Sequence, residues 1–375
     1  MSENGFSPVV NVQNRFAHVD ALRAFAVLVV VFAHAGLGSI VPGGSGVTIF
    51  FCISGFVITF IVLKESHKTG KFDILRFYRN RALKILPPLF LAIVVPSLIW
   101  SIWNYIDWQA FSGQVFFYYN WVKVGGGADV LPGTGVVWSL SIEEQFYLVF
   151  AAVWLCVVRA KCRVAWLAVL ALLCIIYSTI SRFVLYLGNA EESRIYYGSD
   201  TRLDGIAYGI LLGIAYHRWL SQGAKSTKGI ARLGGPWTLV LAVTVYLLSL
   251  AIRDEFFRET MRYSFQSLSA CAVLAYGLVP GTGTLRSLFN RISGARLITA
   301  IGLSSYSIYL CHLVIGSAIM ERLASWPIAL KGGLGIFLGL TVGYLMYISI
   351  ELPVQQWKSR RDRDAQRPTA NPLIS

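Results

Sequence analysis

Apolar runs long enough to cross a lipid bilayer recur along the whole chain, separated by short polar segments. We count ten runs, with nine or eleven as open alternatives, at 19–38, 47–63, 85–103, 138–158, 164–187, 203–219, 236–252, 263–280, 298–320 and 327–350. The second and sixth runs are short and contain glycine, so either could be a broken or re-entrant helix. The pattern predicts an all-α fold, a polytopic transmembrane bundle of about ten helices.

Basic residues gather in alternate gaps between these runs. Most Lys and Arg lie at the two chain ends and in the gaps after the second, fourth, sixth and eighth runs. Cytoplasmic loops are enriched in Lys and Arg, so both termini are predicted to be cytoplasmic. We therefore divide the chain into a cytoplasmic segment at 1–18, a membrane domain at 19–357 and a polar cytoplasmic tail at 358–375.

One alternative concerns the first run, where Ala33-His34-Ala35 follows an apolar stretch and imitates a signal-peptide cleavage site. The preceding segment is long and polar and lacks a basic region. We expect the run to remain as the first transmembrane helix.

Composition excludes most other classes of protein. Of 375 residues, 55% are hydrophobic and only 14% are charged, which argues against a soluble enzyme, a disordered chain or a coiled coil. The net charge of +14 would suggest nucleic acid in a soluble protein, but here the basic residues belong to cytoplasmic loops. The expected partner is the lipid bilayer, and no nucleic acid is expected. The six cysteines show no C-x-x-C spacing, so neither a disulfide framework nor a metal site is predicted.

The first run carries charged and histidine side chains that lipid would disfavour. Each charged residue at a helix centre costs about 2.5–3.5 kcal/mol on insertion scales, so such residues usually face a cavity. Arg23 and His34 are separated by about three helical turns and share one face, with Asp20 one turn before Arg23 and able to pair with it. The alternatives are an arginine that reaches the membrane interface and a histidine satisfied within the bundle.

Two adjacent carboxylates, Glu143 and Glu144, lie near the start of the fourth run. Neighbouring helical residues are about 100° apart, so only one of the two can face a bundle interior fully. Alternatively, Ser139 or Ser141 caps the helix and the acids complement its dipole. That alternative explains one carboxylate better than two.

Two further runs combine polar and aromatic side chains. Arg202 and Asp204 begin the sixth run on its outer side, where a simple interfacial ion pair is a competing interpretation. The ninth run contains Tyr309 and His312, with His312 expected in the outer half. Its serines could instead serve only to bring helices close together.

A basic segment from Arg76 to Pro88 leads into the third run, with Arg79, Arg81 and Lys84 interleaved with aromatic residues. It predicts an amphipathic helix at the cytoplasmic surface. Anionic lipid headgroups are the simplest partner. A phosphate-rich ligand such as a coenzyme A nucleotide is the more specific one, because guanidinium groups match phosphate oxygens.

These features, in this order, resemble the acyltransferase 3 family of polytopic bacterial membrane proteins over about residues 17–357. The motifs that carry the resemblance are Arg23 to His34, the glycine-rich stretch Gly46 to Phe56, Phe77-Tyr78 to Pro87, Trp138-Ser139-Leu140 with Glu143 and Phe146-Tyr147, Arg202-Leu203-Asp204, Ser305 to His312, and Glu351-Leu352-Pro353. The basic segment departs from the family pattern Arg-Arg-x-x-Arg, since it reads Asn80-Arg81-Ala82-Leu83-Lys84. We expect the standalone type, without the C-terminal esterase-like domain of one family branch.

The resemblance implies an O-acyltransferase of the bacterial cytoplasmic (inner) membrane. Such an enzyme moves an acyl group, most often acetyl, from acyl-coenzyme A to a hydroxyl of a surface or exported polysaccharide or a lipid-linked sugar. Acetyl-coenzyme A is then a co-substrate, and no permanently bound cofactor is expected. A small secondary metabolite such as a macrolide sugar is an alternative acceptor. A secondary transporter or exporter is the alternative of a different class, since broken helices and buried charges also suit transport.

The resemblance also suggests roles for individual residues. Arg79, Arg81 and Lys84, with Arg23, would hold the nucleotide phosphates. His34 would act as general base towards the acceptor hydroxyl, with an acyl-histidine intermediate as the variant. Glu143 would orient its imidazole or stabilise its cation. The remaining expected donor- or substrate-binding residues are Glu144, Arg202, Asp204, Tyr309 and His312.

Overall fold

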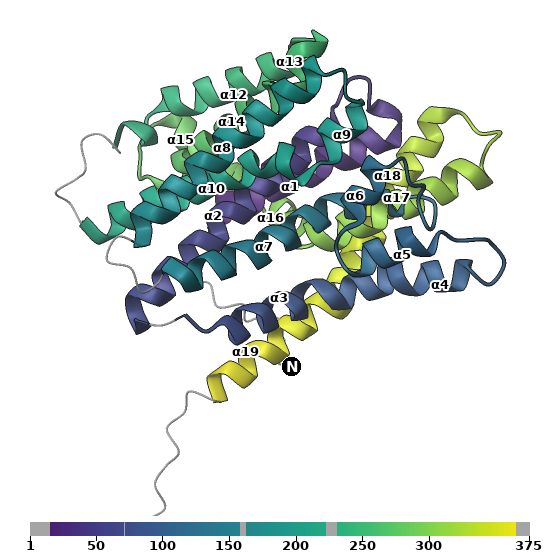
Figure 1. The fold of residues 1–375 in the computed structure, drawn as a ribbon, viewed down its shortest axis with the longest axis horizontal. Helices are drawn as coiled ribbons and strands as arrows, with labels where there is room; N and C mark the ends of the chain where they lie inside the picture. Colours follow the sequence, from purple (N-terminus) through teal and green to yellow (C-terminus); the bar gives the residue numbers. More distant parts are fainter. Residues whose placement is uncertain (1–15, 71, 158–162, 223–230, 365–375) are drawn as a thin grey trace, which may run out of the picture.

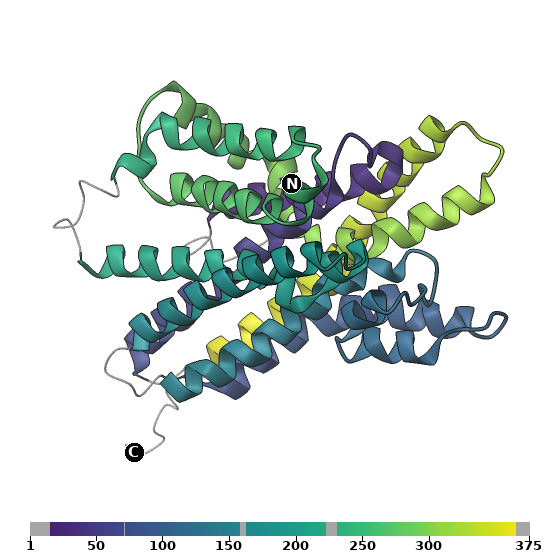
Figure 2. The ribbon, with the colours of Figure 1, turned by 45° about the horizontal axis from the view of Figure 1, so that its top comes forward.

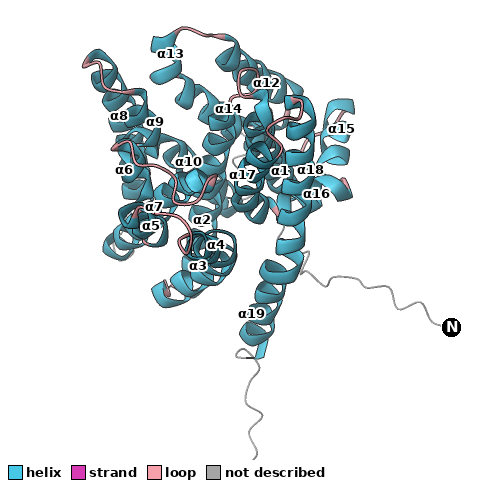
Figure 3. Ribbon diagram, turned by 90° about the vertical axis from the view of Figure 1, so that its right-hand side faces the viewer, coloured by secondary structure: helices cyan, strands magenta, loops and turns pink. Residues whose placement is uncertain are grey.

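The structure, a computed structural model, describes residues 16–70, 72–157, 163–222 and 231–364. Over these residues it consists of helices and connecting loops, with no β-strand (Figure 3). The predicted all-α class is therefore confirmed. The predicted segment at 1–18 and the tail at 358–375 lie largely outside the described residues.

Each of the ten apolar runs forms helix in the structure. The long helices are α1 (Ala17–Phe32), α2 (Gly43–Thr69), α3 (Ile74–Leu89), α7 (Val137–Val157), α8 (Arg163–Leu187), α10 (Ser199–Gln222), α12 (Pro236–Ala251), α14 (Arg262–Leu278), α17 (Ser305–Arg322) and α18 (Ile328–Met346). Shorter helices are α4 (Val95–Trp100), α5 (Trp108–Val115), α6 (Tyr119–Val124), α9 (Glu192–Tyr197), α13 (Glu255–Glu259), α15 (Thr284–Ser293), α16 (Arg296–Leu303) and α19 (Leu352–Asp364). Three π-helical turns, η2 (Ala33–Leu37), η3 (Phe90–Val94) and η7 (Tyr347–Glu351), extend α1, α3 and α18, and 3₁₀ turns lie at η4 (Thr134–Val136) and η6 (Arg232–Gly234).

Six helical segments of the described chain are long and apolar enough to cross a membrane, and a seventh is obtained if α16 and α17 form one bent span. The count of about ten spans stays a prediction. The two short, glycine-interrupted runs both lie in continuous helices, α2 and α10. The break falls instead between α16 and α17, which meet at 73°. There the Ser304 hydroxyl donates to the carbonyl of Ala300, a local bond that competes with helical pairing and bends helices.

Helix α2 lies at the centre of the bundle. Of the residues in its most apolar stretch, 72% are buried, compared with 17% for α8. It crosses α10 closely because both helices present glycine. A Cβ atom on Gly209 would lie 2.8 Å from the backbone nitrogen of Phe56, and one on Gly55 would collide with the backbone of Ile206. On α8, by contrast, large apolar side chains such as Leu173 and Ile180 are about half exposed, as expected of a helix that faces lipid.

Two helical hairpins flank this centre (Figures 1 and 2). Helices α12 and α14 pack together along one edge, and α17 and α18 form a pair at one end of the bundle. The buried glycines of α18 allow the second pair to pack tightly, since a Cβ atom on Gly339 would lie 3.1 Å from Cα of His312. Helix α1 lies between α2 and α16, and it also contacts α17. This contact brings together the faces of α1 and α17 that carry the charged, hydroxyl and histidine side chains.

Candidate active site

The end of α1 is shaped by the π-helical turn η2. Ala35 and Gly36 leave helical geometry there, and Gly36 has φ +100°, a conformation that favours glycine. Helix α18 closes against this turn at Gly332, which packs on the carbonyl of Ala35. Single π-helical turns inside helices are frequent at functional sites. Here the turn directs the chain away directly after His34 and leaves its imidazole exposed.

The exposed imidazole of His34 is hydrogen-bonded to a second, buried histidine. Nδ1 of His34 lies 3.0 Å from Nε2 of His312, and Nδ1 of His312 lies 2.8 Å from the carbonyl oxygen of Tyr309. A carbonyl only accepts, so Nδ1 of His312 carries a proton, and in a neutral ring its Nε2 is then an acceptor. His34 must therefore donate from Nδ1, and its Nε2 is left unprotonated. Within the described residues, that nitrogen has no hydrogen-bond partner.

A second contact joins α1 to α17 further along both helices. Nε of Arg23 donates to the Ser305 hydroxyl at 3.1 Å. Ser305, Tyr309 and His312 are four and then three residues apart, so they share one face of α17, as Arg23 and His34 share one face of α1. The arginine and the histidine pair therefore lie at two levels of the same helix interface.

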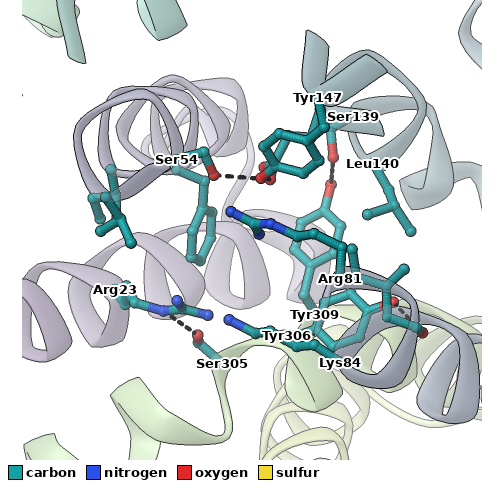
Figure 4. Close-up of a pocket in the computed structure, with 15 residues that line it drawn as sticks. Arg23, Ser54, Arg81, Lys84, Ser139, Leu140, Tyr147, Ser305, Tyr306 and Tyr309 are labelled. Carbon is teal, nitrogen blue, oxygen red and sulfur yellow. Dashed lines mark hydrogen bonds between the residues drawn. The ribbon is translucent and has the colours of Figure 1, made fainter. Parts of the chain in front are cut away.

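A cavity of about 100 Å³ lies at the arginine level, and we call it the basic cavity. Arg23, Arg81 and Lys84 direct their charged ends into it from α1 and α3 (Figure 4). Glu143 of α7 lies across from them and accepts hydrogen bonds of 2.8 Å from the hydroxyls of Ser54 and Tyr147. Three cations face one carboxylate, so the basic cavity is suited to an anionic group.

The place of Glu143 corrects one prediction. We expected it to lie beside His34 and orient the imidazole, but it makes no hydrogen bond to His34 and belongs to the basic cavity. The partner that orients His34 is His312. The sequence places residues on helices, but the rotation of α7 against α1 depends on packing that hydropathy does not encode.

A second cavity of about 430 Å³ lies at the histidine level, and we call it the histidine cavity. Its lining combines His34, Lys123, Asp129, Trp138, Tyr196 and Tyr197. Its volume is within the range of about 300–1,000 Å³ typical of ligand sites. Aromatic faces beside a few charged groups suit a ligand with both polar and apolar surfaces, such as a sugar.

One wall of the histidine cavity is a loop organised by Asp129. Its carboxylate accepts from the hydroxyl of Tyr119 at 3.1 Å, from Nζ of Lys123 at 3.3 Å, and from the backbone N–H groups of Gly133 and Gly135 at 3.2 and 3.0 Å. No sequence motif pointed to Asp129, because its role depends on a loop conformation.

Tyr309 separates the two cavities and lines both. Its hydroxyl lies 2.7 Å from that of Ser139, and it donates to the carbonyl of Val136 at 3.0 Å. Tyr309, a predicted site residue, is therefore the one described side chain of α17 that borders both the basic and the histidine cavity. His312 lies one helical turn further along α17.

The remaining predicted residues fall into separate environments. Arg202 is 1% exposed and does not pair with Asp204, so an interfacial ion pair between them is excluded. Its guanidinium donates to Thr48 at 3.0 Å and lies 4.0 Å from the ring centre of Tyr263. Asp204 instead forms a buried ion pair of 2.8 Å with Arg182.

Arg182 is a residue whose importance the sequence did not reveal. It is fully buried on α8 and also donates to the backbone carbonyls of Thr201 and Thr260 at 2.6 and 2.7 Å. The one indication in the sequence was that this arginine lies within an apolar run. This network fixes α8 and α10 and does not reach either cavity.

Two predicted residues lie outside the basic cavity. Arg79 is half exposed and forms an ion pair of 3.3 Å with Asp362 of α19. Glu144 does not line the cavity, and its Oε1 is buried without a hydrogen-bond partner among the described residues. Of the two adjacent carboxylates, Glu143 is the one that faces the bundle interior.

Comparison with known proteins gives a consistent set of relatives. The profile of the acyltransferase 3 family, described as an acyltransferase domain, matches residues 16–348. A putative peptidoglycan O-acetyltransferase, YrhL of Bacillus subtilis, is 28% identical over 363 residues, covering 90% of this chain and 54% of the relative. The O-acetyltransferase OatA of Staphylococcus aureus is 28% identical over 309 residues, covering 79% of this chain and 50% of the relative.

The peptidoglycan O-acetyltransferase OatA of Listeria monocytogenes is 26% identical over 359 residues, with 90% of this chain and 55% of the relative covered. The chain thus spans about half the length of these curated relatives. No solved structure matches it significantly.

Proposed function

The chain belongs to the acyltransferase 3 family, and from this membership we propose that it transfers an acyl group, most simply acetyl, to a hydroxyl of a cell-wall polysaccharide. Three relatives that align with most of this chain are named as O-acetyltransferases, and two of those names specify peptidoglycan. These names support a polymeric carbohydrate acceptor over a small metabolite such as a macrolide sugar. Membership of an acyltransferase family also favours an enzyme over a transporter.

The observation that carries the proposal is the hydrogen-bonded pair of His34 and His312 beside the histidine cavity. The pair supplies an unprotonated Nε2 on an exposed ring, held by a buried partner that is itself fixed by a carbonyl. A general base needs such an accessible, oriented nitrogen. His34 and His312 are therefore the proposed base and its positioning residue.

In the proposed reaction, Nε2 of His34 takes the proton of the acceptor hydroxyl while the hydroxyl oxygen attacks the acyl carbon. The bond from the acyl carbon to the leaving group then breaks, and the leaving group takes the proton from Nε2 of His34, which regenerates the base. The positive charge that develops on His34 is stabilised through its Nδ1–H bond to His312. In the acyl-histidine variant, the same Nε2 first receives the acyl group itself.

We assign the donor to the basic cavity, where Arg23, Arg81 and Lys84 can neutralise an anionic donor. A volume of about 100 Å³ admits only part of a donor such as acetyl-coenzyme A, and the three cations favour the part that carries its phosphates. The rest of the nucleotide would extend towards the surface of α3. Tyr309 borders both cavities, so an acyl group at this tyrosine would lie between donor and acceptor.

We further propose a multi-pass protein of the bacterial cytoplasmic membrane with about ten spans and cytoplasmic termini. The alternation of basic gaps along the sequence supports this topology. The corresponding membrane domain is 19–357, followed by a polar tail at 358–375. Accessibility labelling of single cysteines placed at 5 and 370 in intact cells tests it, because labelling from outside would contradict cytoplasmic ends.

The central test replaces His34 with alanine in cells that depend on this protein for acylation. Ester-linked acetyl groups on purified cell-wall glycans are measured by mass spectrometry, and the amount of membrane protein is measured by immunoblot. The matched control is His67→Ala, since His67 is exposed on α2 and lines neither cavity. We expect acetylation to be lost in the first variant and kept in the second. Normal acetylation in His34→Ala would refute the assignment of the base.

A second experiment tests the donor. Purified protein in lipid nanodiscs is incubated with acetyl-coenzyme A labelled in its acetyl group, and the release of free coenzyme A is measured with and without a glycan acceptor. Release that requires Lys84 supports the proposed donor. Glycan acetylation in cells without any use of acetyl-coenzyme A by the purified protein would contradict it and indicate a different acyl donor.

A further inference from the structure

A third cavity, of about 180 Å³, adjoins the histidine cavity, and we call it the Arg258 cavity. Gly44 and Tyr196 line both cavities, so the two share one wall. A Cβ atom on Gly44 would lie 2.8 Å from the Tyr196 hydroxyl, which shows how closely the two residues approach. The remaining lining includes Glu192, Arg258, Arg262, Tyr263 and Gln266.

Three side chains of the Arg258 cavity have no hydrogen-bond or ion-pair partner within the described part of the chain, whereas Ser45, which also lines it, is bonded to Tyr246 at 2.8 Å. Neither Arg258 nor Arg262 forms an ion pair with a described carboxylate, although Glu192 lines the same cavity. Nε of Arg258 is buried without a hydrogen-bond partner. Gln266 is only 1% exposed, and its side-chain amide makes no hydrogen bond to a described residue. A buried amide and two unpaired guanidinium groups therefore converge on one small space.

The wall between the two cavities adds donors and positive charge. Burial raises the pKa of Tyr196 to about 12, so its hydroxyl stays protonated and can donate a hydrogen bond. Arg202 lies behind the wall, 5.4 Å from the ring centre of Tyr196 and 4.0 Å from that of Tyr263, and its Nη1 has no hydrogen-bond partner among the described residues. Unpaired guanidinium groups in a partly enclosed site attract anions strongly, because little solvent screens them.

We propose that the Arg258 cavity is an anion subsite that binds a carboxylate carried by the acceptor glycan, next to the sugar unit in the histidine cavity. This inference rests on the proposed function in one respect only, that the histidine cavity holds the acceptor. Arg258 and Arg262 supply the charged donors and Gln266 a neutral one. Glu192 lines the same cavity and repels an anionic ligand, so the attraction for a carboxylate comes from the two arginines.

Binding is measured by surface plasmon resonance on the full chain in phosphatidylcholine nanodiscs. The probes are an N-acetylhexosamine oligosaccharide with one free carboxylate and the same oligosaccharide as its methyl ester. We expect the acid to bind the unaltered protein roughly tenfold more tightly than the ester. Arg258→Gln and Arg262→Gln should each abolish most of that difference.

Two variants provide controls. Arg253→Gln removes an equal charge from an exposed arginine outside the cavity, and it should leave the difference between acid and ester unchanged. Glu192→Gln removes the carboxylate of the cavity and should tighten binding of the acid. This gain guards against a loss that reflects only misfolding.

The outcomes separate the subsite from the proposed function. Equal binding of acid and ester by the unaltered protein would overturn the anion subsite and leave a glycan acceptor intact. A preference for the acid that Arg258→Gln and Arg262→Gln both retain would also overturn it. Binding of neither oligosaccharide would overturn both the subsite and the glycan acceptor. Nanodiscs that contain phosphatidylglycerol provide one further comparison. If they suppress binding of the acid only in protein with both arginines, lipid phosphate competes for the same site. That result supports the proposed anion subsite.

Discussion

Replacing His312 provides the sharpest test of the proposed site, because this residue acts through His34 and need not contact either substrate. His312 is 3% exposed, and its Nε2 receives the Nδ1–H of His34 at 3.0 Å. His312→Ala removes that acceptor and leaves the His34 ring free to rotate. The base remains present, but its unprotonated nitrogen is no longer held towards the histidine cavity.

The size of the effect follows from the hydrogen bond that is lost. During transfer His34 becomes positively charged, and a hydrogen bond from a charged donor contributes about 1.5–3 kcal/mol. Because each 1.36 kcal/mol corresponds to a factor of ten in rate, kcat is expected to fall by about 10- to 150-fold. Loss of the base itself in His34→Ala is expected to cost about 10²–10⁴. His312→Gln should recover part of the rate, because its amide oxygen can accept from Nδ1.

The assay compares the single variants with the double variant His34→Ala/His312→Ala. Steady-state acyl transfer is measured on purified protein in nanodiscs, and folding is checked by size-exclusion chromatography. A positioning residue has nothing to position once the base is gone, so the double variant should be no slower than His34→Ala alone.

Two results would refute this reasoning. Fully additive losses in the double variant would mean that His312 contributes independently of His34. A rise in acceptor KM with unchanged kcat in His312→Ala would mean that His312 binds substrate rather than orienting the base.

Three further predictions concern binding and stability. Lys84→Ala should raise the donor KM roughly tenfold with the acceptor KM unchanged, whereas Lys68→Ala, outside the basic cavity, should change neither in the same kinetic assay. Asp204→Asn should lower stability by about 3–5 kcal/mol, seen as a lower unfolding temperature, because a buried guanidinium loses its charged partner. Gly209→Val should lower the stability by about 1–3 kcal/mol, because it forces α2 and α10 apart. The control is Gly333→Val, since a Cβ atom on Gly333 meets nothing within 4 Å. Equal unfolding temperatures for the two variants would contradict the close crossing.

Much of the architecture could be predicted from hydropathy. The ten apolar runs all form helix, and the basic segment before the third run forms the first turns of α3, as expected for an amphipathic helix. The bend between α16 and α17 was not predicted, because the apolar run continues through Ser304. The break is marked by bonds from the Ser304 hydroxyl to the carbonyls of Ala300 and Ile301, which hydropathy does not report. The π-helical turn after His34 was likewise missed, since its glycine resembles many others in the chain.

Part of the predicted set of site residues lies together in the structure, whereas Arg79, Glu144, Arg202 and Asp204 line neither the basic nor the histidine cavity. Arg23, Glu143 and Tyr309 line the basic cavity, His34 lines the histidine cavity, and His312 is bonded to His34. Their grouping differs from the expectation, because Glu143 faces the basic cluster while the histidines face each other.

Local composition and the periodicity of a single helix are enough to identify the helical segments and the side chains that lipid would disfavour. The partners of these side chains, by contrast, depend on how the helices pack. His34 and His312 are 278 residues apart in the chain, and their contact depends on the turn after His34 and on the glycines that bring α18 against α17. Hydropathy does not specify how one helix is rotated against another, because that rotation is set by the interlocking of side chains across each interface.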